Sequence, residues 1–411
     1  MSALVLASCE DDIITEAQAE KDKLTYKPDV LDEAELNLYI ITNGVIHNST
    51  TVSVERSINQ YLEGRAGRKF DTKLNIVYYN ETTGESSEKD VNGDLVKYAS
   101  YSEFLAGKTE GIVLITSEAQ LDAYIANDQL ADMNPYFEDD SLVKKYEFAK
   151  LAASLYKTNP KLLDFAKDVV DEKEKLFFVP NNRVMGSYDY VLINEYIARE
   201  LLYYTEDELQ KIEWNDDQIA NLKAKFLENE SKILALYPEF NVDKAIIKAE
   251  DKKYEDRFDY TDDGYICCVM NNPELTRSEL AEAGFAILKP AGFDPYLDVK
   301  DITDPAKLEE YTKALKEYKI YEAAAMEIVY LINADVEMRN LLLYGKEGVN
   351  YSIKNGVVVP QEKDGNRYYI MDLKYTGDIF LAHFCESEGR SLWTKDMKDF
   401  GLKQNSECVA K

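Results

Sequence analysis

The chain has 411 residues, of which 48 are Lys or Arg and 77 are Asp or Glu, so its formal net charge is −29. This length predicts two or three domains, or one large two-lobed fold. The acidic excess excludes a nucleic-acid-binding role, because a phosphate backbone is bound by a basic surface. It also argues against adhesion of the folded surface to anionic lipid. No stretch reaches the roughly 18 apolar residues that a membrane span requires.

Histidine and cysteine usage limits the metal and redox chemistry of the chain. The sequence contains only 2 His, which excludes a site built from several histidines. Cys267 and Cys268 are adjacent and cannot pair without strain, while Cys385 and Cys408 are far apart in sequence. This is not the pattern of a disulfide framework. We expect no metal and no cofactor.

The first residues resemble a processing signal. Leu6-Ala7-Ser8-Cys9 has the form of a lipobox, in which the cysteine becomes a lipidated N-terminus. Only MSALV precedes it, which is shorter than the basic and apolar regions of a secretory signal, so either the signal begins upstream or the match is accidental. We favour lipidation at Cys9. Residues 10–29 are acidic and of low complexity, and they predict a tether without a core.

The next segment alternates strands with helices. "ELNLYIIT" (Glu35–Thr42), "KLNIVYYN" (Lys73–Asn80) and Gly111–Thr116 are short apolar runs that predict buried strands. Helical periodicity follows the first strand, and Ser117 with Gln120 forms a capping-box pattern after the third. This alternation predicts a parallel sheet covered on both faces, with ligands bound beyond the carboxyl ends of the strands. We therefore place Asn43, Thr116 and Ser117 on the rim of a ligand site.

The rest of the chain continues the mixture of strands and helices. We expect a helical stretch over 141–173, the strand "KLFFVP", the loop "NNRVMGSYDY" and a capping box at Thr205 and Glu208. Further helical segments reach about residue 251. "GYICCVMN" and "GFAILKP" (284–290) predict strands. Asp304-Pro305 begins a helix over 306–334, and Asp335 begins a shorter helix that Gly345 ends.

Several segments resemble one family. The run "AMEIVYLINADVEMRNLLLYGKEGVNYSI", which contains Tyr344–Tyr351, resembles extracellular solute-binding lipoproteins of ABC importers. "YYIMDLKYTGDIFLAHFC" and "QNSECV" are similar to the C-terminal parts of such proteins in Gram-positive bacteria. "GFAILKP" is similar to the strand by which their chain returns to the first lobe, whereas Ala291–Asp301 departs from the pattern as an insertion. The resemblance covers most of the chain from about residue 34.

The resemblance implies a periplasmic-binding-protein-like α/β fold with two lobes that close on a ligand. It implies a signal remnant and tether in 1–29, a first lobe in 30–140 and 285–345, and a second lobe in 141–284 and 346–411. It further implies a monomeric, extracytoplasmic protein, lipid-anchored to the outer face of the membrane. Such a protein captures a solute, with an oligosaccharide as the first expectation, and delivers it to permease subunits.

Each candidate ligand residue also has a structural explanation. Tyr188 and Tyr190 could stack on sugar rings or pack in a core, and Asn43, Asn181 and Asn182 could bond hydroxyls or shape turns. Trp214 could stack on a ligand at a solvent-exposed edge or pack in a core. Arg277 could bind a ligand carboxylate or hydroxyl pair through its guanidinium, or lie in solvent at the start of a helix. The remaining candidates are Glu347 and Tyr351 of the Gly345–Tyr351 segment. Only Trp214 and Trp393 are tryptophans, so tyrosine would have to supply most stacking platforms.

Enzyme signatures are absent from the sequence. There is no G-x-S-x-G and no G-x-x-x-x-G-K-[ST]. Paired carboxylates for glycoside hydrolysis are not singled out among 77 acidic residues. We expect a binding protein rather than an enzyme. The alternatives are a binder of peptides or other polar solutes with the same fold, a surface glycan-active enzyme, and an adhesion or scaffold module.

Overall fold

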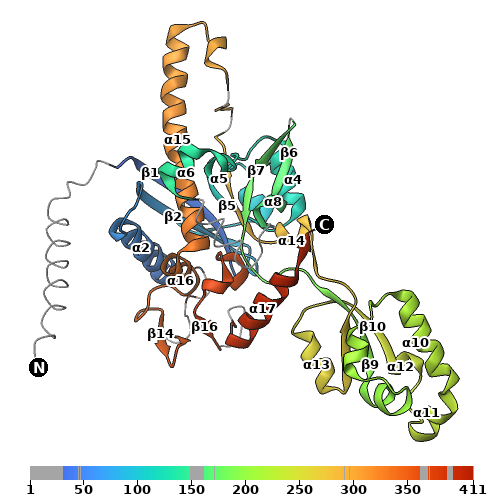
Figure 1. Ribbon diagram of the computed structural model, residues 1–411. Helices are drawn as coiled ribbons and strands as arrows, with labels where there is room; N and C mark the ends of the chain where they lie inside the picture. Colours follow the sequence, from blue (N-terminus) through green and yellow to red (C-terminus); the bar gives the residue numbers. More distant parts are fainter. Residues whose placement is uncertain are drawn as a thin grey trace, which may run out of the picture.

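The chain forms two separately packed parts joined by two crossing segments (Figure 1). The computed structural model describes residues 31–411 apart from 45, 47, 149–161, 171, 291, 296, 362–368, 370, 387–391 and 411. The small part consists of residues 188–270, and the large part contains most of the remaining described residues. Both parts combine sheets with helices, so the expected two-part α/β architecture is confirmed. Cys9 lies outside the described residues.

A seven-stranded sheet forms the centre of the large part. β1 pairs with β2 and with β5 in parallel, as the alternation of strands and helices predicts. β13 joins β5 antiparallel, and β8 then joins β13 antiparallel. Across the sheet the strands are β4 (Leu95–Lys97), β3 (Glu85–Lys89), β2 (Asp71–Asn80), β1 (Glu33–Thr42), β5 (Gly111–Ile115), β13 (Gly284–Leu288) and β8 (Phe178–Pro180).

Helices pack against this sheet because its central strands are apolar on both faces. All five residues of β5 and all five of β13 are buried. α2 packs against β2 and α16, while α15 packs against β1, β5 and β13. The helices of the large part are α2 (Asn48–Gly64), α3 (Tyr101–Leu105), α4 (Glu118–Ala126), α5 (Pro135–Glu138), α6 (Asp140–Tyr146), α8 (Leu162–Phe165), α14 (Arg277–Leu280), α15 (Pro305–Ala334) and α16 (Val336–Tyr344).

The long helix α15 begins and ends where the sequence predicts. Asp304 accepts a hydrogen bond from the Ala306 N–H, and Pro305 occupies the first turn. The N-terminal half of α15 projects beyond the sheet (Figure 1). Phe293 stacks on Tyr311 of this projection, and η2 (Val299–Asp301) lies in the same preceding segment.

The small part is a three-stranded antiparallel sheet with helices on both faces. Its strands follow the order β10 (Ile246–Lys252), β9 (Tyr188–Asn194), β11 (Tyr265–Val269). One face carries a core that includes Trp214, and the other a core that includes Tyr188 and Tyr190. The helices are η1 (Ile197–Leu201), α9 (Glu206–Gln210), α10 (Asp216–Glu228), α11 (Glu230–Leu236), α12 (Val242–Ala245) and α13 (Asp256–Asp262). The predicted capping box of Thr205 and Glu208 is present at the start of α9.

The C-terminal segment packs mostly on the large part. Its buried residues from Tyr351 to Trp393 belong to the same core cluster as the seven-stranded sheet. The lobe boundaries expected at residues 141, 285 and 346 describe which segments move as one body when the lobes close. These boundaries stay a prediction. The elements here are β14 (Tyr351–Lys354), β15 (Val357–Pro360), η3 (Leu373–Tyr375), η4 (Ile379–Leu381), β16 (Phe384–Cys385), α17 (Lys395–Glu407) and β17 (Val409–Ala410), the last of which pairs with β12 (Glu274–Leu275).

Two expected helical segments are wrong, and the loop expected over 181–190 ends earlier because β9 begins at Tyr188. The helix expected over 141–173 is replaced in its last part by a hairpin of β6 (Lys167–Val170) and β7 (Lys173–Leu176). The helical segments expected up to residue 251 end at Ala245, and β10 then pairs with β9. In both places a strand partner, rather than local helical propensity, decides the structure.

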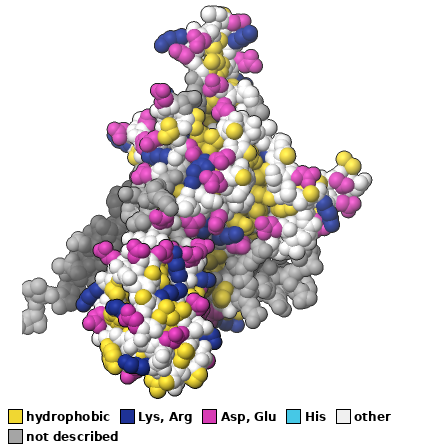
Figure 2. Space-filling model, turned by 90° about the vertical axis from the view of Figure 1, so that its right-hand side faces the viewer, with side chains coloured by type: hydrophobic (Ala, Val, Ile, Leu, Met, Phe, Trp, Pro, Cys, Tyr) yellow, Lys and Arg dark blue, Asp and Glu magenta, His cyan; other side chains and the backbone are white. Residues whose placement is uncertain are grey.

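The surface carries both signs of charge. On the face shown in Figure 2, acidic and basic side chains are interspersed over both parts, without a continuous basic area. Within the described ranges, no helix has both the length and the apolar character needed to cross a membrane.

Candidate functional site

Four predicted residues meet at the carboxyl edge of the large sheet. Because β1 and β5 are parallel neighbours, Asn43 and Thr116 follow their ends on the same side. Ser117 comes next in the chain. Gly284 pairs with both Ile115 and Pro180, so Asn181, directly after β8, reaches this edge as well. The first crossing segment, residues 181–187, leaves the large part from here.

Two of these four side chains are engaged in beginning α4. The Ser117 hydroxyl accepts the Gln120 N–H, as expected. The reciprocal bond of a capping box is not made, because the Gln120 Oε1 atom accepts from the N–H and the hydroxyl of Thr116, at 2.9 and 3.1 Å. Local helix capping therefore accounts for both Thr116 and Ser117.

The two asparagines at the edge each retain an unused polar atom. Asn181 donates through Nδ2 to the Lys374 carbonyl at 2.8 Å, but its Oδ1 atom is buried without a partner. Asn43 accepts from the Thr82 hydroxyl at 3.4 Å, and its Nδ2 atom is buried without a partner. Buried unpaired polar atoms are costly and call for an explanation such as a water or ligand. Together they offer one donor and one acceptor at the same edge.

Asn182 has a structural environment. Its Nδ2 atom donates to the Asp378 carboxylate at 2.9 Å, and both side chains are buried. The Asn182 carbonyl also accepts the Ile379 N–H. Burial is the main reason why the pKa of Asp378 is raised to about 6. This contact ties the first crossing segment to the C-terminal segment.

The predicted aromatic residues of the small part point into its cores. Tyr188 and Tyr190 are fully buried with their rings stacked 5.6 Å apart. The Tyr188 hydroxyl donates to Glu407, whereas the Tyr190 hydroxyl is buried without a partner. Trp214 is buried in the core on the opposite face and donates to the Leu209 carbonyl at 2.9 Å. Core packing therefore accounts for all three, and a ligand role for them stays a prediction.

Arg277 is compensated by three carboxylates. Its guanidinium lies 3.1 Å from Glu118, 2.7 Å from Asp122 and 3.0 Å from Asp168. These partners come from α4 and β6, so Arg277 ties α14 to two other elements of the large part. A fork to a ligand carboxylate would have to compete with these contacts.

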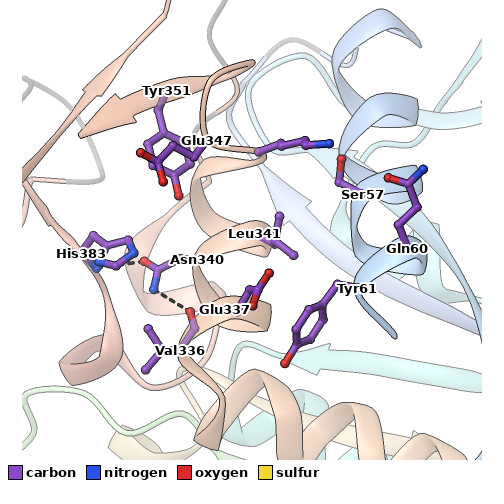
Figure 3. Close-up of a pocket in the computed structure, with 11 residues that line it drawn as sticks. Ser57, Gln60, Tyr61, Val336, Glu337, Asn340, Leu341, Glu347, Tyr351 and His383 are labelled. Atoms are coloured by element: carbon purple, nitrogen blue, oxygen red, sulfur yellow. Dashed lines mark hydrogen bonds between the residues drawn. The ribbon is translucent and has the colours of Figure 1, made fainter. Parts of the chain in front are cut away.

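The other two predicted residues lie in a pocket of the large part. Glu347 and Tyr351 line a cavity of about 730 Å³ between α2 and α16 (Figure 3). Sequence reasoning missed the rest of the lining, which consists of Ser57, Gln60, Tyr61, Val336, Glu337, Asn340, Leu341, Lys346 and His383. The rarity of histidine was the one available signal for His383, but it did not indicate which segment would face it. The structure thus divides the predicted residues between the sheet edge, the small part and this pocket.

Metal ligation has no support in the described ranges. No group of three or more His, Cys, Asp or Glu side chains there is arranged to hold a metal ion. The side chains at the sheet edge are hydroxyls and amides, which suit neutral polar ligands.

The chain was compared with known families, curated proteins and solved structures. No family model and no curated protein sequence matches it. Among solved structures it is similar to the N-glycan transport solute-binding protein NgtS of Streptococcus pneumoniae, with 14% identity, a TM-score of 0.44, and coverage of 92% of this chain and 83% of that one. It is also similar to an extracellular solute-binding protein of Bifidobacterium longum subsp. infantis, with 11% identity, a TM-score of 0.40, and coverage of 91% and 82%. The TM-scores are low, so the ligands of these proteins are not evidence for the ligand of this chain.

Proposed function

We propose that this chain is the extracytoplasmic substrate-binding component of an ABC importer. It captures a small solute between its two parts and delivers that solute to permease subunits. It acts as a monomer anchored through lipidated Cys9, and it performs no chemistry on the solute. The proposal brings together the sequence resemblance, the lipobox and the architecture of the described residues.

The observation that carries the proposal is the way in which the two parts are joined. Each part has its own core, and the first crossing segment leaves from the carboxyl edge of the parallel strands. The second crossing segment returns through β12 and α14 to β13, whose first residue lies at the same edge. A ligand at this edge lies beside both connections. It can shift the balance between open and closed arrangements by contacting the closed one more extensively.

An oligosaccharide is the ligand class that we propose. The edge offers amides from Asn43 and Asn181, each with one unused polar atom, and amides pair well with hydroxyl groups. Both tryptophans are buried, so an aromatic platform would have to come from tyrosine. A peptide or another polar solute is the alternative within the same mode of action.

The test is a ligand screen on the full chain. Thermal unfolding is followed in the presence of mono- and oligosaccharides and of short peptides, and X-ray scattering measures the radius of gyration with each hit. A ligand at about 100 times its Kd adds about 2.7 kcal/mol of stability. We expect a shift from a few related oligosaccharides, a smaller radius of gyration, and recovery of the sugar intact.

A matched pair of variants locates the site. Asn43→Ala should weaken binding, whereas Asn75→Ala, in the same sheet but in the middle of β2, should not. Stabilisation by peptides alone would replace the solute class and keep the mode of action. Recovery of a cleaved sugar would refute the transport proposal and favour the glycan-active alternative.

A further inference from the structure

The pocket between α2 and α16 has the size and depth of a ligand site. Its volume of about 730 Å³ lies within the range of small-molecule pockets, roughly 300–1,000 Å³. One wall is α2, with Ser57, Gln60 and Tyr61, and the other is α16 (Figure 3). None of its lining residues belongs to the sheet edge, to the crossing segments or to the small part. It is therefore distinct from the site of the proposed function, and the inference drawn from it does not rest on that function.

The charges of the pocket are unbalanced. Glu337 and Glu347 are exposed, and neither forms an ion pair with a described cation. Lys346 is the one ammonium among the lining residues, against these two carboxylates. Partial burial lowers the pKa of His383 from its usual 6.5, so this imidazole is neutral at pH 7 and has a lone pair to offer. The lining is therefore net negative and rich in hydrogen-bond acceptors.

A buried tyrosine presents an unpaired hydroxyl to the same cavity. Tyr351 is only 6% exposed, and its hydroxyl forms no hydrogen bond to another described residue. Burial and the nearby charges of Glu347 and Glu337 raise its pKa to about 12, so both carboxylates lie within electrostatic reach of this oxygen. Exposed carboxylates alone would be explained by solvation. Tyr351 adds a side chain that is more than nine-tenths buried and whose unbonded hydroxyl opens into the cavity, where it can pair with a ligand.

Aromatic faces complete the lining. Tyr61 projects from α2 toward Glu337, and Tyr351 lies beside Glu347 (Figure 3). Aromatic rings beside carboxylates attract organic cations through their quadrupoles and through charge. A neutral solute could form a hydrogen bond with the Tyr351 hydroxyl, but it would not neutralise the excess negative charge of Glu337 and Glu347.

We propose that this pocket binds a small organic molecule that carries a protonated primary amine. The ammonium group lies between the carboxylates of Glu337 and Glu347 and donates to the Tyr351 hydroxyl oxygen. Polar groups on the remainder of the molecule face Ser57, Gln60 and the neutral His383.

The test compares matched amines and neutral analogues on the full chain. Calorimetric titrations use glucosamine, ethanolamine and putrescine at millimolar concentrations, with N-acetylglucosamine and glucose as neutral controls. We expect at least one amine to bind, no binding of the neutral sugars in this pocket, and weaker binding as ionic strength rises. Tyr351→Phe keeps the ring and removes the hydroxyl, and it should weaken binding several-fold.

Charge variants provide the decisive comparison. Glu337→Gln with Glu347→Gln should weaken amine binding by at least about tenfold, which corresponds to ~1.4 kcal/mol. Glu33→Gln with Glu63→Gln removes the same charge from exposed positions outside the pocket and should leave binding unchanged. Thermal unfolding of each variant establishes that it is folded. Absence of binding by all three amines, binding of a neutral sugar that the Glu337 and Glu347 double variant weakens equally, or full amine affinity in that double variant would overturn the proposal. Loss of oligosaccharide binding in Asn43→Ala would not affect it.

Discussion

The buried carboxyl of Asp378 makes stability depend on pH in a direction that is unusual for an acid. Asp378 lies beneath the first crossing segment, where its two oxygens accept from the Asn182 Nδ2 atom at 2.9 Å and from the Phe380 N–H at 2.8 Å. These bonds, together with the charges of Arg339 and Lys398, favour the ionised form. Burial outweighs them and raises the pKa from 3.8 to about 6.

The size of the effect follows from this shift. Since the folded-state pKa is higher than the unfolded one, the folded state binds the proton of Asp378 more tightly. The resulting stabilisation is complete below about pH 4 and is lost as the pH rises through 6. A difference of about two pKa units is worth about 3 kcal/mol.

The variant Asp378→Asn removes this dependence, because its amide is neutral at every pH. Urea unfolding should be measured for both proteins at intervals from pH 4 to pH 7. The free energy of unfolding of the variant, minus that of the wild type, should rise by about 2.4 kcal/mol over this range, because at pH 4 the unfolded carboxyl is still partly ionised. The difference in unfolding free energy between the two proteins at pH 4 reports how well the amide replaces the carboxyl as the hydrogen-bond partner of Asn182. His383 titrates equally in both proteins and cancels in the difference.

Two results would refute the reasoning. A difference that is constant from pH 4 to pH 7 would mean that Asp378 titrates alike in the folded and unfolded chains. A difference that falls with pH would mean that the hydrogen bonds and nearby cations outweigh burial. Asp139→Asn is a suitable contrast when the series is extended below about pH 4, because the exposed Asp139 caps α6 and its hydrogen bonds lower its pKa from 3.8. Its stabilisation is lost as the pH falls, so its pH dependence should have the opposite sign.

Three further changes test the packing around the connections between the parts. Gly377→Ala should destabilise the protein by about 2 kcal/mol more than Gly93→Ala in urea unfolding, because both glycines have positive φ but only at Gly377 would a Cβ meet a backbone carbonyl of α15. Equal losses of stability in the two glycine variants would show that the strain of a positive φ accounts for the effect and that the contact with α15 adds nothing. Arg277→Lys keeps the positive charge but loses the planar guanidinium that contacts three carboxylates, so it should lower the free energy of unfolding by about 1 kcal/mol, and by less at high salt. A loss of stability that salt does not reduce would contradict an electrostatic role for these contacts. Gln404→Ala in α17 should lower the free energy of unfolding by about 1–3 kcal/mol because the hydrogen-bond partners of Gln404 are buried, whereas Ser406→Ala on the exposed side of the same helix should change it little. Similar losses in the two variants would show that the buried bonds of Gln404 do not stabilise the protein.

The central strands were predictable because burial decides their sequence. β1, β2, β5 and β13 are short apolar runs, and each forms where expected. The sheet edge was predictable from the same pattern, because parallel neighbours end on one side. Asn43 and Thr116 meet there although they are distant in the chain.

The hairpin of β6 and β7 could not be predicted from local signals. Its turn contains Glu172 with a φ of 62°, where glycine or asparagine would have indicated a hairpin. The pocket was hidden for a different reason. Tyr61 reaches the pocket because α2 packs against α16, and His383 reaches it because its backbone N–H donates to Asn340 of α16. Neither contact is specified by the periodicity of a helix. Tyr188 was expected on a loop, but it is the first residue of β9, and pairing with β10 places its side chain in a core.

The C-terminal helix determines how freely the two parts can move. On the large part, Lys398 of α17 donates to the Phe380 carbonyl at 2.7 Å. On the small part, the Gln404 Oε1 atom accepts the Tyr254 N–H at 2.7 Å, and Phe400 stacks on Phe258 at 4.5 Å. One helix therefore holds both parts.

The same helix also holds the first crossing segment. Gln404 donates to the Met185 carbonyl at 2.8 Å, and Asn405 donates to the Arg183 carbonyl at 2.8 Å. Closure by rotation within residues 183–186 would break these bonds, and nothing in the low-dielectric interior would replace them. Either α17 travels with the small part, or the ligand must supply the free energy to detach it. Gln404→Ala removes part of this restraint, so it should lower stability while raising affinity for a ligand that requires closure.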